Sequence, residues 1–434
     1  MANNYDIIII GGGLAGLACG ITAAKKGKKC AVVSAGPPAL DFSSGSFDLL
    51  NVLPDGAKVD NPLEAARHLP KEHPYSKIGN VEMYVRRTEN ILELAGLSMQ
   101  GNANKNHYRI SPVGNFCPTW LTAKGLLTSE NAESLPFKNA LIMAPSGFLD
   151  FYPKFIGEAL ESKGISVEHA RFHLANKNHI NRLPVSLLIG RGLIRGRKRR
   201  NNPVEMRSAN IAEVYDKNIS KLARIINKQK TKAEVVLLPA LVGLEGNAFE
   251  ELRSRSNKQI YMLATMPPSV PGINIAITLR NAFIKAGGTF IRNQKVTSAN
   301  FTADTAERKV DSVQSIDEND NISTLTANNF VLATGGIFSG GLRTSLDNVK
   351  EVIFDVEVSA EDKREKWFSH KVLDNQPYMN FGVRTDSSFR AIKNGSAVEN
   401  LYAIGACLDG CNTLEEGSGA GVSLLTGLYV GENL

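Results

Sequence analysis

The chain has 434 residues, of which 43% are hydrophobic and 21% are charged, so it is long enough to form two or three domains with a large core. This composition excludes a disordered chain, a collagen-like repeat and a small disulfide-stabilised protein. Fifty Lys and Arg against 43 Asp and Glu give a net charge of +7, which suits an anionic ligand or a membrane surface without requiring either.

The chain opens with the pattern of a βαβ unit. Residues 5–10 (YDIIII) form an apolar β-branched run, typical of a strand buried on both faces. Residues 14–26 are rich in Ala and Leu and end at Gly27, which predicts a helix with a glycine C-cap. Residues 30–34 (CAVVS) predict the next strand.

A glycine-rich loop joins the first predicted strand to the first helix. Its G-x-G-x-x-G spacing is typical of nucleotide-binding sites: the first glycine permits a tight turn, the second admits a phosphate to the helix N-terminus, and the third allows close helix packing. The alternative is a glycine-rich turn without a ligand. We predict a nucleotide site made by Gly11, Gly12, Gly13, Leu14, Ala15 and Gly16.

The usual acidic partner of this fingerprint is missing. Dinucleotide sites normally place Asp or Glu at the end of the second strand, where the carboxylate binds the adenosine ribose. Here that strand ends at Ser34, followed by 35–38 (AGPP). We therefore favour FMN, which has a phosphate and no adenosine, over FAD. The alternative is a dinucleotide held by Ser34 and backbone groups alone.

A serine-rich segment follows the βαβ unit. Ser43, Ser44, Gly45 and Ser46 offer hydroxyl and N–H groups that suit a phosphate or the edge of a flavin ring. The flanking Phe42 and Phe47 are expected to draw the segment inward. The alternative is a solvated turn.

Three further segments, nearer the C-terminal end, resemble the first loop because each places glycines where the backbone could approach a ligand closely. Predicted strands at 329–334 and 400–405 lead into glycines, and a glycine-rich stretch at 415–427 leads into a last helix. We expect the flavin to be contacted there by Thr334, Gly335, Gly405, Gly419 and Gly421.

The basic run, the histidines and the cysteines do not point to one particular function. The basic run 191–200 suits phosphate, nucleic acid or anionic lipid, but it is also typical of a solvated loop, and no aromatic residues are interleaved with it. The seven histidines show no metal-ligand pattern, and no Cys-x-x-Cys pair supports an iron–sulfur or zinc site. Cys407 and Cys411 are interpreted as small apolar fillers. We expect no metal and no nucleic-acid partner, and we identify no catalytic residue.

Several blocks together resemble the B subunit of anaerobic glycerol-3-phosphate dehydrogenase. They are the N-terminal fingerprint, 42–50 (FSSGSFDLL), 201–212 (NNPVEMRSANIA), 267–270 (PPSV) with its following helix, 333–336 (ATGG), 338–342 (FSGGL), 381–383 (FGV) and 400–405 (NLYAIG). The blocks span most of the chain, and FSSGSFDLL and PPSVPGI are the most particular among them.

The resemblance implies an FMN-containing subunit of a complex that oxidises sn-glycerol 3-phosphate to dihydroxyacetone phosphate and passes electrons to a quinone in anaerobic respiration. It implies two partners, an FAD-bearing catalytic subunit and a membrane-attached iron–sulfur subunit. The polar N-terminus and the lack of an apolar run of about 18 residues agree with peripheral attachment to the cytoplasmic side of the inner membrane, without a signal peptide or transmembrane helix.

The expected fold is α/β, a GR2-like FAD/NAD(P)-binding Rossmann domain with an inserted α+β cap domain. The Rossmann domain is expected to comprise 1–80 and 261–434, and the cap 81–260. Because the chain ends at Leu434, we expect the last helix to be short. Two alternatives stay open: a stand-alone FAD-dependent oxidoreductase acting on a small organic acid, and a non-catalytic scaffold or binding module with a degenerate flavin fold.

Overall fold

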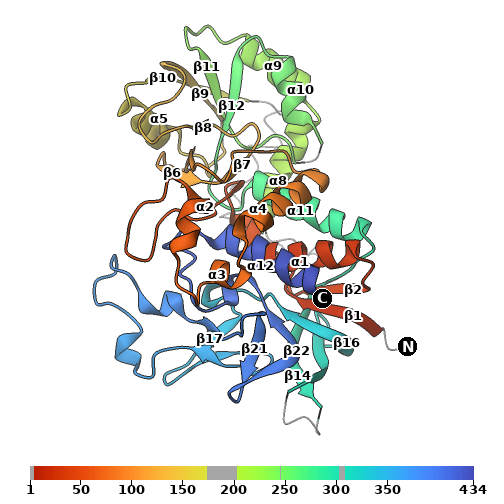
Figure 1. Ribbon diagram of the computed structural model, residues 1–434. Coiled ribbons are helices and arrows are strands. Elements are labelled where there is room, and N and C mark those ends of the chain that lie inside the picture. The colour runs from red at the N-terminus through yellow and green to blue at the C-terminus, as the bar shows by residue number, and fades with distance from the viewer. Residues whose placement is uncertain (1–3, 174–202, 245, 303–307) are drawn as a thin grey trace. The chain divides into compact units, whose positions relative to one another are not determined.

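The computed structural model describes residues 4–173, 203–244, 246–302 and 308–434 (Figure 1). The chain forms two compact units, one of residues 1–39, 47–106 and 276–434, the other of residues 40–46 and 107–275. These bounds differ from the predicted ones at 80/81 and 260/261, and the predicted domain division stays a prediction.

The first unit is built on a sheet whose parallel strands follow the order β13-β2-β1-β16-β22. Apolar β-branched residues dominate β1, and its four isoleucines are buried, as expected of a parallel strand that is covered on both faces. The strands are β1 (Asn4–Ile10), β2 (Cys30–Ser34), β13 (Thr289–Arg292), β16 (Ile322–Leu332) and β22 (Ser396–Ala403).

Two glycine-containing helices pack tightly in this unit. The helix α1 (Leu14–Lys25) lies beside α12 (Gly419–Asn433), as Figure 1 shows. A Cβ at Gly427 would lie 2.5 Å from the carbonyl oxygen of Ala15, and one at Gly431 would lie 2.6 Å from that of Cys19. These glycines therefore allow α12 to pack closely against α1. Because α12 has 15 residues, the expectation of a short last helix was wrong.

Antiparallel strands and short helices complete the first unit. The strand β16 continues the parallel sheet at one end and pairs with the antiparallel hairpin β14–β15 at the other. These elements are α2 (Pro62–Ala65), α3 (Pro74–Ile78), α4 (Val81–Leu94), β4 (Met99–Gln100), β14 (Gln294–Phe301), β15 (Val310–Asp317), β17 (Leu342–Thr344), β18 (Val349–Glu351), β19 (Val358–Ser359), β20 (Gly382–Val383) and β21 (Arg390–Lys393).

The second unit has a more regular sheet than the sequence indicates. Its four strands run parallel in the order β10-β9-β11-β12, and β9 and β11 are almost wholly buried. The main elements are β9 (Asn139–Pro145), α5 (Pro153–Glu161), β10 (Ser166–Phe172), α8 (Pro203–Asp216), α9 (Ile219–Asn227), β11 (Val235–Pro239), α10 (Ala248–Ser254) and β12 (Gln259–Leu263). The helix α11 (Val270–Lys285) carries the chain on into the first unit.

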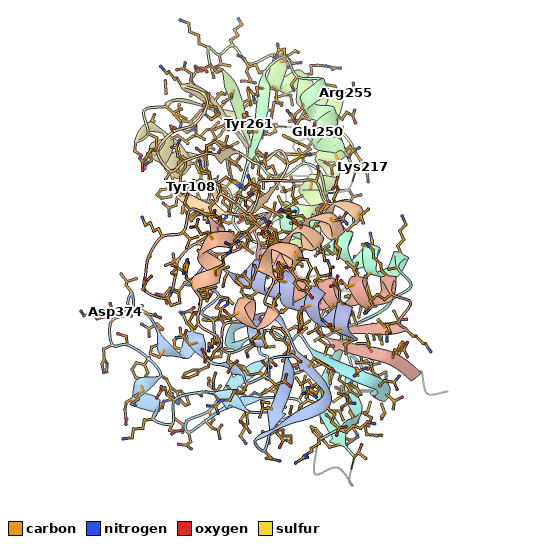
Figure 2. All side chains as sticks on the ribbon, in the orientation of Figure 1. Tyr108, Lys217, Glu250, Arg255, Tyr261 and Asp374 are labelled. Carbon is orange, nitrogen blue, oxygen red and sulfur yellow. The ribbon has the colours of Figure 1, made fainter. Side chains whose placement is uncertain are left out.

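Smaller strands and exposed charges surround this core. The short strands are β5 (His107–Ile110), β6 (Phe116–Thr119), β7 (Leu121–Ala123) and β8 (Thr128–Ser129). The helices of this unit carry charged pairs on their outer faces, such as Arg255 with Glu251, and Figure 2 shows the side chains Lys217, Glu250 and Arg255 there. The parallel sheets and their helices confirm the α/β class.

Candidate functional site

The predicted site residues of the first unit follow strands that end at one edge of the sheet. In the parallel registers, Ile10 pairs with Val33 and with Leu332, and Leu332 in turn pairs with Ala403. The glycine loop, Ser34, Thr334 and Gly405 come directly after these positions. Ligands of open parallel sheets bind at this carboxyl edge, so the topology brings the predicted groups to one place.

The glycine loop is shaped by backbone contacts that exclude side chains. Gly11 has φ +123°, and a Cβ there would lie 2.2 Å from the carbonyl oxygen of Ala333. A Cβ at Gly16 would lie 2.0 Å from the carbonyl oxygen of Gly11. Gly13 differs, because a Cβ there would meet no described atom within 4 Å. The loop is therefore closed on the side of the strands and open at Gly13.

The N-terminus of α1 lies at this open position. Gly13 is its N-cap, and within the described residues no side chain caps the helix and no acidic residue stands in its first turn. Amide N–H groups of a first turn point outward, and the helix dipole favours an anion there. The loop thus offers the chemistry of a phosphate site.

A second close approach involves the loop after β16. Gly335 has φ +76°, and a Cβ at Gly341 would lie 1.9 Å from its carbonyl oxygen. The hydroxyl oxygen of Thr334 is buried and has no hydrogen-bond partner among the described residues. A buried hydroxyl without a partner is costly, so a ligand atom at this position would satisfy it.

The three predicted glycines near the C-terminus have different surroundings. Gly405 has φ +75°, and a Cβ there would lie 2.7 Å from the Cβ of Ala15, so it borders the first loop. Gly421 instead packs inside the unit, since a Cβ there would lie 2.1 Å from the hydroxyl oxygen of Tyr75. Gly419 begins α12 and has only ordinary contacts with Thr413.

The residues around Ser34 include a neighbour that the sequence did not indicate. The Ser34 hydroxyl is buried and donates to the carbonyl oxygen of Gly36 at 3.0 Å. A Cβ at Gly12 would lie 2.7 Å from the Ser34 Oγ and 2.9 Å from the Cζ of Phe290. In the next strand, β13, Arg292 is the register partner of Ser34.

The serine-rich segment belongs to the second unit and is held there. The Ser269 hydroxyl donates to the carbonyl oxygen of Ser43, and the Thr122 hydroxyl donates to the Ser46 hydroxyl oxygen at 3.3 Å. A Cβ at Gly45 would lie 2.6 Å from Pro271. The two most particular blocks of the sequence, FSSGSFDLL and PPSVPGI, therefore contact each other. Phe42 is exposed, so the expectation that it draws the segment inward was wrong, whereas Phe47 is buried.

The basic run and two of the cysteines were also considered from the sequence, and the structure bears on them as follows. The basic run 191–200 lies outside the described residues. Cys407 is a free, buried thiol, and burial raises its pKa to about 12, which agrees with an inert apolar filler. Cys411 is also free and buried. In the described parts of the chain, no helix combines the length and apolar character needed to cross a membrane.

A buried pair supports the loop before α12. His73 Nδ1 accepts the backbone N–H of Tyr75 at 3.0 Å, and His73 Nε2 lies 3.2 Å from Glu416 Oε2. Burial alone would raise the pKa of the Glu416 carboxyl, but hydrogen bonds from His73, Asn412 and Ser418 outweigh it and lower that pKa. Because His73 and Glu416 are 343 positions apart in the chain, the sequence alone does not indicate that they pair.

The glycine cradle and the orphaned Thr334 hydroxyl fit a flavin nucleotide. The fit rests on the open position and the uncapped first turn at Gly13, and on the buried Thr334 hydroxyl, which has no partner among the described residues. The structure brings together the loop 11–16, Ser34, Thr334, Gly335 and Gly405 within one unit.

Comparison with known proteins identifies the family of this chain and agrees with a flavin-binding fold. A family model described as an FAD binding domain matches residues 6–422. A protein of Yersinia enterocolitica named as the B subunit of anaerobic glycerol-3-phosphate dehydrogenase is 39% identical, over 99% of this chain and 98% of its own length. A protein of the same name from Actinobacillus pleuropneumoniae is 32% identical over 99% of both chains. Among solved structures, the quinol fumarate reductase FrdA of E. coli aligns with a TM-score of 0.42 and 9% identity, covering 99% of this chain and 69% of that one.

Proposed function

This chain belongs to the B-subunit family of anaerobic glycerol-3-phosphate dehydrogenase, and from that premise we propose that it carries the flavin of such a subunit. The reaction of the complex would remove two electrons and two protons from the secondary alcohol of sn-glycerol 3-phosphate and give dihydroxyacetone phosphate. The electrons would reduce a quinone, which takes up two protons to become a quinol.

The observation that supports this proposal most is the meeting of three loops at one edge of the sheet. The first-turn amides of α1 would hold the flavin phosphate at Gly13, where no side chain intrudes. The Thr334 hydroxyl and the backbone at Gly335 and Gly405 would line the remainder of the site. A bound flavin supplies a two-electron acceptor and a means to pass electrons onward.

We assign FMN rather than FAD to this site. The family model is named for FAD. Against this, Ser34 stands where an adenosine ribose would need a carboxylate, and its hydroxyl already donates within its own loop. Without a carboxylate at this strand end, the site lacks the usual acceptor for the hydroxyls of an adenosine ribose. The phosphate site at the glycine loop does not depend on that carboxylate.

We also propose partner subunits for this chain. The curated relatives are named as subunits, which implies a complex of several chains. Exposed apolar side chains recur between residues 338 and 373, where Phe338 is 71% exposed, Val372 88% and Leu373 100%. Exposed apolar residues of this kind are typical of protein interfaces, and we assign this segment to contact with an FAD-bearing or iron–sulfur partner. Peripheral membrane attachment would then come through the partners.

The test is to purify the chain, denature it and separate the released compounds by chromatography. Release of FMN in stoichiometric amount is the expected result. Release of FAD would overturn the FMN assignment and leave a flavoprotein. A colourless protein that releases nothing would favour the scaffold alternative, and turnover of an organic acid by the isolated chain would favour the stand-alone oxidoreductase.

A further inference from the structure

Two guanidinium groups lie beside the strand end where a dinucleotide site has its carboxylate. Arg292 ends β13 and is the register partner of Ser34, which ends β2. The guanidinium carbon of Arg292 lies 5.9 Å from the centroid of the Phe290 ring, and that of Arg280 lies 6.0 Å from the same centroid. Both cations therefore gather around one aromatic ring.

The same ring borders the glycine loop. The Cζ of Phe290 would lie 2.9 Å from a Cβ at Gly12, which is the residue before the open position Gly13. Because Phe290 and Arg292 are two residues apart on one strand, their side chains share a face of the sheet. Phe290 therefore lies close both to the glycine loop at Gly12 and to the guanidinium group of Arg292.

The positive charge of Arg292 is not neutralised by a carboxylate of the described residues, so its guanidinium group is available to an anionic ligand. Within the described residues no carboxylate forms an ion pair with it, and its side chain is exposed. Ser34 offers no carboxylate to the two hydroxyls of a ribose. A guanidinium binds the terminal oxygens of a phosphomonoester in bidentate fashion, and it has no acceptor for a ribose hydroxyl.

From this arrangement we infer that Arg292 is a specificity-determining residue that selects a flavin bearing a terminal phosphomonoester. Arg280 adds a second positive charge at the Phe290 ring. The inference rests on the proposed function, because it concerns the same flavin site. It adds the group that discriminates FMN from riboflavin and from FAD.

The experiment compares flavin affinities of the full chain after its bound flavin has been removed. Titrations with FMN, riboflavin and FAD are followed by the change in flavin fluorescence. Arg292→Ala is expected to raise the Kd for FMN about 10- to 100-fold, since hydrogen bonds to charged groups contribute at that scale, and to leave the Kd for riboflavin unchanged. Arg292→Lys should recover part of the loss because it keeps the charge but not the bidentate geometry.

The matched control is Arg308→Ala, which removes the same charge from another exposed position of the same unit. It should leave all three affinities unchanged. Raising the salt concentration should weaken FMN binding in the parent protein more than in Arg292→Ala. Circular dichroism of both variants checks that the fold is retained.

Two outcomes would overturn the inference while the proposed function stands. One is an unchanged Kd for FMN in Arg292→Ala, and the other is an equal or larger loss for FAD than for FMN, which would assign Arg292 to an adenine. A parent chain that binds none of the three flavins would instead overturn the proposed function, and this inference with it.

Discussion

Glu416 and His73, 343 positions apart in the chain, form a fully internal hydrogen bond of 3.2 Å in the first unit. Because His73 Nδ1 accepts from the backbone of Tyr75, its proton lies on Nε2, which donates to the carboxylate. The carbonyl oxygen of Glu416 also accepts the backbone N–H groups of Asn51 and Val52. This pair ties two distant segments together just before α12.

Glu416→Gln is expected to destabilise the protein by about 2 kcal/mol at neutral pH, because it removes a charge-assisted acceptor from a buried donor. The folded state lowers the pKa of this carboxyl, so its stabilising effect is present above the ordinary glutamate pKa and is lost as the pH falls through the lower folded value. The difference between parent and variant should therefore shrink below about pH 4.

Denaturant unfolding at several pH values measures this difference. The matched control is Glu415→Gln at the exposed neighbouring position, which should change stability little at any pH. A pH-independent loss in Glu416→Gln would show that the carboxylate charge is not what stabilises the pair.

Gly13→Asp is expected to abolish flavin retention while the chain still folds. A Cβ at Gly13 meets no described atom within 4 Å, so the side chain fits the empty protein, but its carboxylate would repel a phosphate at the helix N-terminus. The ratio of flavin to protein absorbance in the purified protein measures retention.

Gly13→Asn is the matched control, since it has nearly the same size without the charge. It should retain more flavin than Gly13→Asp, and Gly13→Ala more again. Equal retention in all three variants would place the phosphate elsewhere.

The glycine loop and the strands at 5–10 and 30–34 could be predicted because local patterns determine them: an apolar run, a turn that only glycine permits, and a helix cap. The role of Arg292 could not, because it depends on which strand lies beside β2, and that pairing joins residues more than 250 positions apart. Gly421 shows a second limit of the sequence. A glycine-rich stretch does not reveal which glycines are required by packing, and a Cβ at Gly421 would lie 2.1 Å from the hydroxyl oxygen of Tyr75, so its contact with a flavin stays a prediction.

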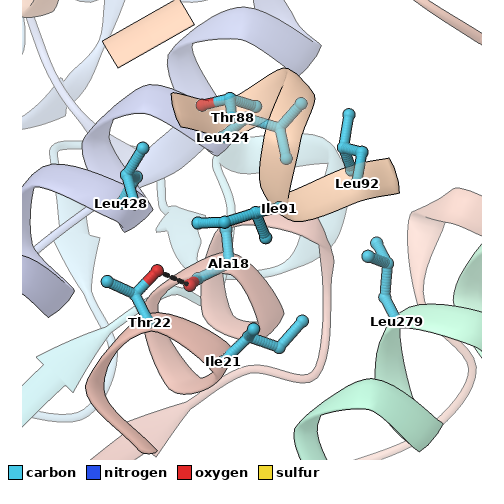
Figure 3. Close-up of a pocket in the computed structure, with 9 residues that line it drawn as sticks. All are labelled: Ala18, Ile21, Thr22, Thr88, Ile91, Leu92, Leu279, Leu424 and Leu428. Carbon is cyan, nitrogen blue, oxygen red and sulfur yellow. Dashed lines mark hydrogen bonds between the residues drawn. The ribbon is translucent and has the colours of Figure 1, made fainter. Parts of the chain in front are cut away.

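Thr88→Val is expected to raise the stability of the protein by about 1 kcal/mol. Thr88 is buried on α4, and its hydroxyl has no hydrogen-bond partner among the described residues. It lies at an apolar pocket lined mainly by aliphatic side chains, shown in Figure 3. Valine has the same shape without the unsatisfied hydroxyl, so the desolvation cost disappears.

Thr22→Val in the same pocket is the control, because the Thr22 hydroxyl donates to the carbonyl oxygen of Ala18 at 2.8 Å. This substitution should leave stability unchanged or lower it. Urea midpoints of the two variants measure the contrast, and a loss of stability in Thr88→Val would mean that its hydroxyl has a partner such as bound water.

Leu373→Asp is expected to weaken assembly with the partner subunits without changing the stability or flavin content of this chain. Its side chain is 100% exposed, so it contributes nothing to the core, and a carboxylate there meets no packing in the free chain. In a complex the same carboxylate would be desolvated against an apolar surface, which costs several kcal/mol when no cation pairs with it. Co-purification of tagged subunits measures assembly, and Ile322→Asp, at an exposed apolar residue of the hairpin strand β16, is the control. If both variants assemble as the parent does, the segment 338–373 is not the contact surface.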